Sequence, residues 1–209
     1  MRFSTFLAGF MAVCAVSAIP TSIFLPVGNL PSQPTTSTLV LKDLDTLNTA
    51  ITDLGTAVQN IINFKKTNIG NGVTLLTAVL EKTIAYQIAT QTARLNAQGI
   101  AGTFSLDDSV AVINQLKNVI YPILKIATDL LNTAKTVGAL GTNTSIAGSP
   151  VNILSPLGLT NYLELIKTDT AGFTTALLSY IDPTLQPNAT AVTNNMNNLL
   201  NVTYDFYTT

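Results

Sequence analysis

The segment VLKDLDTLNTAITDLGTAVQNI, residues 40–61, decides the fold of this 209-residue chain. Its large apolar side chains recur at alternating steps of four and three residues, the spacing that places them on one stripe of an α-helix. Asp, Asn and Thr fall on the opposite face. The pattern therefore predicts a long amphipathic helix that begins after Ser37 and buries this stripe: Val40, Leu44, Leu47, Ile51, Leu54, Val58 and Ile61.

A second and a third helix follow from the same period. The second is predicted from about Val73 to Gln98, after a loop at 68–72, with Gly99 as its C-cap. Ser105 is the expected N-cap of the third, which runs to Val137 and carries Pro122 in its interior, so a kink is expected there. The inward side chains of the second helix are expected to be Leu76, Leu80, Ile84, Ile88 and Leu95.

Two more helices complete the chain. A fourth is expected to open at Ser155-Pro156 and to end at Asp182-Pro183, and a last one spans about 190–207. Residues 139–155 are expected to form a polar loop, because no strand alternation is visible. We predict an all-α domain over 37–209, a bundle of about five amphipathic helices with an internal apolar cavity.

The composition excludes several function classes. Charged residues make up 10% of the chain, with 10 basic against 11 acidic side chains, which leaves no basic footprint for nucleic acid. The chain has no histidine and one cysteine, Cys14, so His-based triads, the usual zinc ligand sets and thiol catalysis are excluded. The adjacent carboxylates Asp107 and Asp108 are interpreted as helix N-terminal charge. We expect a protein that is not an enzyme and has no metal or cofactor.

The N-terminus predicts export. Arg2, the apolar run from Phe6 to Val16 and the small residues before Ala18 form a signal peptide over 1–18. The alternative, an uncleaved anchor, is disfavoured because this run is too short to cross a bilayer. Residues 19–36 contain four prolines and are expected to form an extended arm. Three sequons fit an extracellular, wall-associated glycoprotein, and their acceptors are Asn143, Asn188 and Asn201.

An interior slot for an aliphatic ligand is the leading functional hypothesis, and a fully packed core is its alternative. Small side chains on the helices would leave room for such a guest: Ala85, Ala89, Ala93, Ala127, Ala134 and Ala176. The predicted lining is Leu47, Ile51, Leu54, Leu80, Ile84, Leu116, Ile120, Ile123, Ile166, Phe173 and Leu177. Tyr86, Gln87 and Tyr121 are candidate head-group partners, although Tyr and Gln also occur at ordinary core margins. A second hypothesis is adsorption of the helices to a hydrophobic solid or lipid surface.

Three stretches of the chain resemble the hydrophobic surface-binding protein family of filamentous fungi, which includes the cell-wall galactomannoproteins. They are the helix Leu44–Leu54, the segment Thr83–Thr90, and Ser105–Val110, which leads into a Pro-containing helix. The similarity covers about Thr38 to Ile181. It implies an all-helical domain with a hydrophobic cavity, secretion or wall association, and binding of fatty acids or hydrophobic surfaces. A structural wall mannoprotein and an adaptor that recruits a secreted hydrolase are the alternatives it leaves open.

Overall fold

The computed structural model describes residues 37–64, 69–140, 144–146, 149–151 and 158–209. The predicted signal peptide, the arm over 19–36 and the sequon asparagine Asn143 lie outside these residues.

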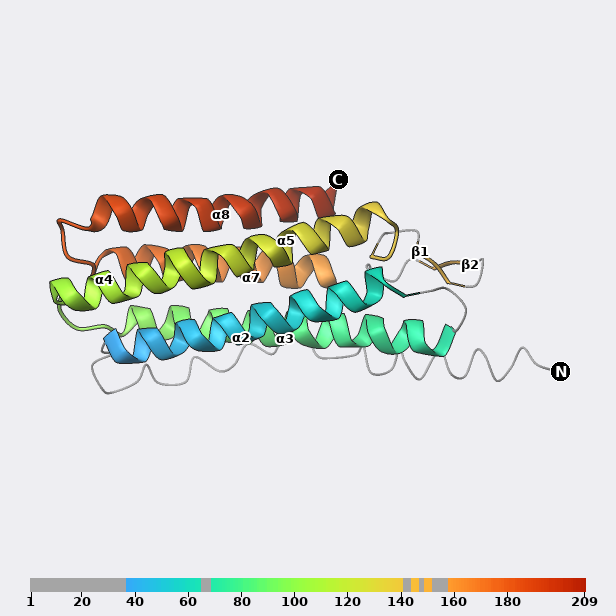
Figure 1. The fold of residues 1–209 in the computed structure, drawn as a ribbon, viewed down its shortest axis with the longest axis horizontal. Helices are drawn as coiled ribbons and strands as arrows, with labels where there is room; N and C mark the ends of the chain where they lie inside the picture. The colour runs from blue at the N-terminus through green and yellow to red at the C-terminus, as the bar shows by residue number, and fades with distance from the viewer. Residues whose placement is uncertain (1–36, 65–68, 141–143, 147–148, 152–157) are drawn as a thin grey trace.

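Five helical rods make up nearly all of the described residues (Figure 1). Successive rods run in opposite directions along the long axis of the molecule. The third rod is composite, because α4, a π-helical turn η1 and α5 follow one another without a break. Their bounds are α2 (Ser37–Ile62), α3 (Ile69–Gln98), α4 (Leu106–Gln115), η1 (Leu116–Ile120), α5 (Tyr121–Thr136), α7 (Leu159–Leu178) and α8 (Gln186–Thr208).

The rods form a closed ring. α3 packs against α2 and α7, α8 packs against α7 and α5, and α5 packs against α2. Because each rod has two neighbours, the apolar faces point to a common centre, as the hydrophobic effect requires. The predicted all-α bundle is confirmed.

The α2 stripe is buried as predicted. All seven of its apolar residues are at most 6% exposed, and Val40, Leu44 and Val58 are fully buried. Two rods thus pack on α2 through a face that the 3.6-residue period defines.

The predicted inward face of α3 is partly wrong. Ile88 is 38% exposed, and Ile84 and Leu95 are half-buried. Steps of four residues advance 400° around a helix with 100° per residue, so such a row drifts away from the core. The residues that α3 buries recur at spacings of one to four residues on a wider face, and they include polar side chains: Leu76, Val79, Leu80, Thr83, Tyr86, Gln87, Ala89, Thr90, Ala93 and Ala97.

α3 also begins earlier than expected, at Ile69, so the predicted loop at 68–72 is helical from its second residue. Gly72 is buried beside Phe64, and a Cβ there would lie 3.1 Å from the ring. The glycine therefore allows the end of α2 to approach the first turn of α3.

Pro122 is accommodated by the π-helical turn that precedes it. The backbone N–H of Tyr121 donates to the carbonyl of Leu116, five residues earlier. Such a bulge widens the turn ahead of the proline ring, which otherwise clashes with the carbonyl four residues back. Where the sequence predicts a kink at Pro122, the structure has this π-helical turn.

Helix ends agree with the sequence at some places and differ at others. Gly138 has φ +71°, and the next two N–H groups return to the carbonyl of Ala134, so the helix stops where predicted. α7 is described from Leu159, with Gly158 as its N-cap, and the predicted opening at Ser155-Pro156 lies outside the described residues. α8 begins at Gln186, four residues before the predicted start, because Pro187 is tolerated in a first turn.

The expected polar loop contains a short hairpin. Strands β1 (Thr144–Ile146) and β2 (Ser149–Val151) pair antiparallel, with Thr144 opposite Val151. Strands of three residues are too short to show alternation in the sequence, and they leave the all-α fold class unchanged.

Substituting Ser105→Ala is expected to cost about 1 kcal/mol at pH 7. Ser105 Oγ accepts from the backbone N–H of Asp108 at 3.1 Å and donates to the Asp108 carboxylate at 2.7 Å. The hydrogen bond from Ser105 Oγ to the carboxylate is the main cause that lowers the pKa of Asp108 below its usual 3.8. A hydrogen bond from Ser37 Oγ is the second cause. That part of the stabilisation is present above pH 3.8 and is lost as the pH falls through the lowered pKa.

The free energy of unfolding in urea, measured at pH 7 and pH 3 for both proteins, checks this. The cost of the substitution should be smaller at pH 3. A cost that grows on acidification would contradict the role given to Ser105.

Candidate functional site

Most of the predicted lining residues meet at the centre of the bundle. Nine of the eleven are buried, and Ile84 and Ile123 are half-buried. Leu80 is buried but lies outside the main core cluster. Ile123 packs against that cluster. The members of the single core cluster are Leu47, Ile51, Leu54, Leu116, Ile120, Ile166, Phe173 and Leu177.

A polar seam crosses this apolar interior between α3 and α7. Gln87 Nε2 donates to Asp169 Oδ2 at 3.2 Å, and Arg94 Nε lies 2.9 Å from Asp169 Oδ1. Gln87 and Asp169 are buried. A buried carboxylate needs such partners, so Arg94 and Gln87 together stabilise the charge.

Gly172 makes room for the arginine. A Cβ at this position would lie 2.6 Å from Arg94 Cδ, closer than real Cβ contacts. The side chain of Arg94 thus crosses α7 through a notch and reaches Asp169 one turn earlier.

Of the three candidate head-group partners, the structure brings two together. Tyr86 and Gln87 are buried neighbours on α3, and burial raises the pKa of the Tyr86 phenol, against the smaller lowering effect of Thr170 and Thr90. Tyr86 is therefore a neutral hydroxyl at all ordinary pH values. Thr170 Oγ1 is buried beside this seam and makes no well-aligned hydrogen bond with the described residues. Tyr121 is half-buried on α5. This helix packs against α2 and α8 rather than against α3, so Tyr121 lies apart from the other two candidates.

A concave feature lies on the surface between α2 and α3. It is a groove of about 550 Å³, half open to solvent, to which Leu39, Lys42, Asp43 and Thr46 contribute from α2. From α3 it is lined by Ala85, Ile88, Ala89, Thr92 and Asn96. None of these nine residues is in the predicted lining set. Of the small residues noted in the sequence, Ala85 and Ala89 line the groove. Ala93, Ala127 and Ala134 are buried in the core instead.

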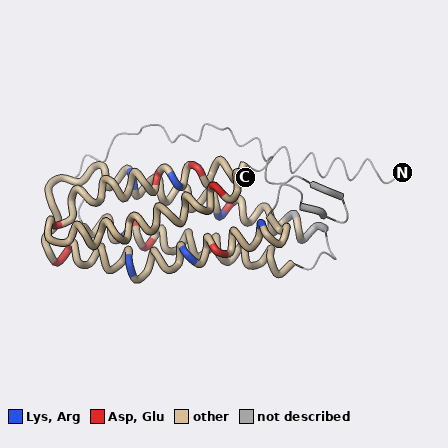
Figure 2. Tube along the Cα trace, turned by 90° about the horizontal axis from the view of Figure 1, so that it is seen from above, with Lys and Arg blue, Asp and Glu red and all other residues tan. Residues whose placement is uncertain are grey.

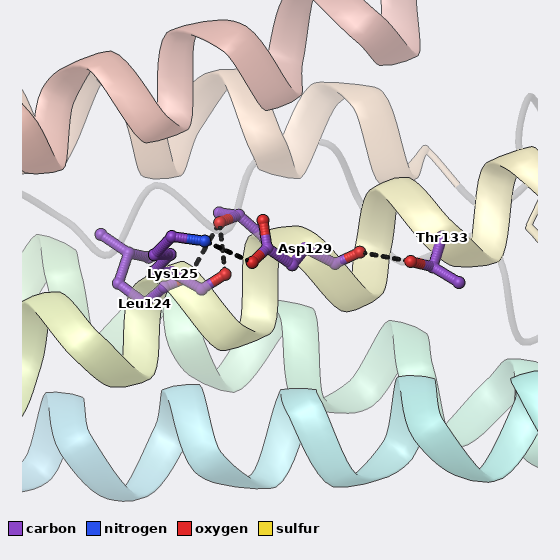
Figure 3. Close-up of polar contacts among 5 residues, drawn as sticks. Leu124, Lys125, Asp129 and Thr133 are labelled. Carbon is purple, nitrogen blue, oxygen red and sulfur yellow. Dashed lines mark hydrogen bonds and ion pairs between the residues drawn. The ribbon is translucent and has the colours of Figure 1, made fainter.

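Positions of basic and acidic residues are scattered along the rods, with the two signs interspersed (Figure 2). Lys125 and Asp129 on α5 are 2.7 Å apart and half-exposed, an ordinary i,i+4 pair that contributes little stability (Figure 3). Within the described residues, no three Asp, Glu, His or Cys side chains gather as metal ligands do. Likewise, none of the helices described is long and apolar enough to span a bilayer.

The sequon asparagines Asn188 and Asn201 are exposed on α8. Thr203, the hydroxyl residue of the sequon at Asn201, is 2% exposed. Both asparagine side chains are open to solvent, which is the position that an attached glycan requires.

Two solved structures share this fold. Over 82% of this chain and 99% of its own length, AFMP4P in complex with palmitic acid superimposes with a TM-score of 0.61 at 16% identity. Ligand binding domain 1 of the Penicillium marneffei MP1 protein, complexed with arachidonic acids, gives 0.59 at 14% identity over 82% and 98%. At the level of the fold, this is the helical architecture that the sequence resemblance implies. No family model and no curated protein matches the chain.

The notch at Gly172 yields a paired test of packing. Gly172→Ala is expected to destabilise the protein by about 1–2 kcal/mol, because the new methyl group displaces Arg94 from Asp169. The matched control is Gly55→Ala on α2, where the nearest atom is 3.7 Å away and helix propensity gains up to about 1 kcal/mol.

Thermal and urea unfolding of both variants measure the difference. Equal effects of the two substitutions would show that Arg94 moves aside without cost.

Proposed function

We propose that this protein is a secreted, non-enzymatic binder of fatty acids or other aliphatic lipids. The shared fold of two proteins solved with palmitic and arachidonic acid carries the proposal. The bundle adds apolar side chains that remain open to a ligand, such as Ile88, which is 38% exposed. Burial of an acyl chain stabilises a complex by about 0.8 kcal/mol per methylene, so such a site needs no elaborate polar motif.

The polar residues of the bundle fit this role better than catalysis. Each oxygen of the buried carboxylate Asp169 already has a partner, Arg94 on one and Gln87 on the other, so its charge is stabilised within the folded chain. Tyr86 is a buried hydroxyl with Thr170 and Thr90 beside it, and burial raises its pKa, so it stays protonated and does not serve as a general base. The predicted signal peptide over 1–18 and the exposed asparagines Asn188 and Asn201 on α8 support secretion and glycosylation, with the cell wall as a place of residence.

Adhesion to hydrophobic surfaces is the second candidate. Leu106 and Val110, one turn apart on α4, are 53% and 42% exposed, and Val202 on α8 is 64% exposed. Apolar side chains in water favour contact with a lipid or solid surface. An adaptor that carries a secreted hydrolase to such a surface would use the same side chains.

Solvent extraction of the purified secreted protein, followed by mass spectrometry, tests lipid binding. We expect a fatty acid in stoichiometric amount, or saturable binding of added palmitic acid to protein stripped of lipid. Bound ligand should also raise the melting temperature, because it binds the folded state alone.

A lipid-free extract together with no binding of added fatty acid would refute the carrier function. Retention on polyester that survives high salt would then favour surface adhesion, since hydrophobic contact is not weakened by screening.

A further inference from the structure

The α2–α3 groove lies between two polar links that join its walls. At one end Asn96 Nδ2 donates to both carboxylate oxygens of Asp43, at 2.9 and 3.1 Å. Beyond Ala85 at the other end, Lys82 Nζ lies 2.7 Å from Asp53 Oδ2. These links fix the spacing of the two helices, so the groove is a built slot with a long open side.

The floor of this slot is apolar and is formed by short side chains. Ala89 is 9% exposed and closes the bottom, while the short side chain of Ala85 leaves its own turn of α3 uncovered. Ile88, on the same wall, is 38% exposed although it is a large apolar side chain. An aliphatic chain laid along the slot would remove Ile88 from water, which is the favourable direction for apolar surface.

One end of the slot carries a cation without an ion-pair partner. Lys42 is exposed, and the three ion pairs found among the described residues do not include it. The carboxylate of the neighbouring Asp43 attracts Lys42 but is buried, and Asn96 donates to both of its oxygens. The hydroxyls of Thr46 and Thr92 donate to carbonyls of their own helices, so they offer no hydrogen to a ligand. Lys42 is thus the donor that suits an anionic head group.

The dimensions suit a long, thin molecule. From Ala85 to Asn96, α3 rises about 16 Å at 1.5 Å per residue. The volume of about 550 Å³ lies within the range of small-molecule sites.

We propose that the groove holds a long-chain fatty acid lengthwise, with its carboxylate at Lys42 and its chain over Ile88 and Ala89 toward Ala85. This inference rests on the proposed lipid binding and names its site, which is outside the central core.

Filling the slot is the first test. Ala85→Phe is expected to weaken binding of palmitic acid to the purified full-length secreted protein about tenfold, equivalent to 1.4 kcal/mol. The control is Ala111→Phe, at an exposed alanine of α4 that does not line the groove. Titration calorimetry on lipid-stripped protein gives both dissociation constants.

Removing the cation is the second test, because it separates head group from chain. Lys42→Gln should weaken binding of palmitic acid but leave binding of 1-hexadecanol unchanged. The control Lys117→Gln removes an exposed lysine of η1 and should change neither.

A palmitic acid analogue with a diazirine on its chain provides a measurement that needs no variant. After irradiation, residue-level mass spectrometry should find the label on Ile88 or Thr92. Label confined to core residues such as Phe173, or wild-type affinity in both groove variants, would overturn the groove and leave lipid binding standing. Absence of binding by the wild-type protein would overturn both.

Discussion

Burial of one apolar face of each rod against two neighbours holds this molecule together. The ring closes only if all five faces turn to the same centre, and Phe173, Ile166 and Leu177 on α7 meet Leu44, Ile51 and Leu54 of α2 within one cluster. The sole cysteine, Cys14, lies within the predicted signal peptide, so packing rather than a disulfide must stabilise the bundle. A core residue removed from any rod therefore weakens contacts to the whole ring.

Polar side chains can share this interior because most of them turn back on their own helix. The hydroxyls of Thr83, Thr90 and Thr128 donate to carbonyls four residues earlier, so they need nothing from the neighbouring rod. Links that do cross between rods are few and directional. Tyr207 donates to the carbonyl of Leu131 and fixes the end of α8 on α5, while Arg94 and Gln87 fix α7 on α3 through Asp169. Such contacts set the register of rods whose apolar faces alone would allow sliding.

The sequence predicted the parts of the fold that follow from a single helix. The stripe on α2 and the cap at Ser105 depend on local spacing and local hydrogen bonds, and both are found. The prediction for the face of α3 was wrong at Ile88, because α3 buries a mixed face that includes Thr83, Gln87 and Thr90. Gly72 and Pro187 also misled, since both are tolerated in a first helical turn. The local pattern did not determine which face of α3 is buried or where α3 and α8 begin.

The same reasoning separates the two candidate places for a lipid. Central residues such as Leu116 and Ile120 already touch one another, so their burial is explained by the folded chain alone. In the α2–α3 groove, Ile88 is a large apolar side chain with no such explanation, and Lys42 is a cation without an ion-pair partner among the described residues. A fully packed core residue has no surface left to give to a ligand, whereas an exposed apolar wall has. The groove arises from two alanines on one helix facing a particular stretch of another. The two alanines indicate small residues on α3, but the position of the groove depends on the stretch of α2 that faces them.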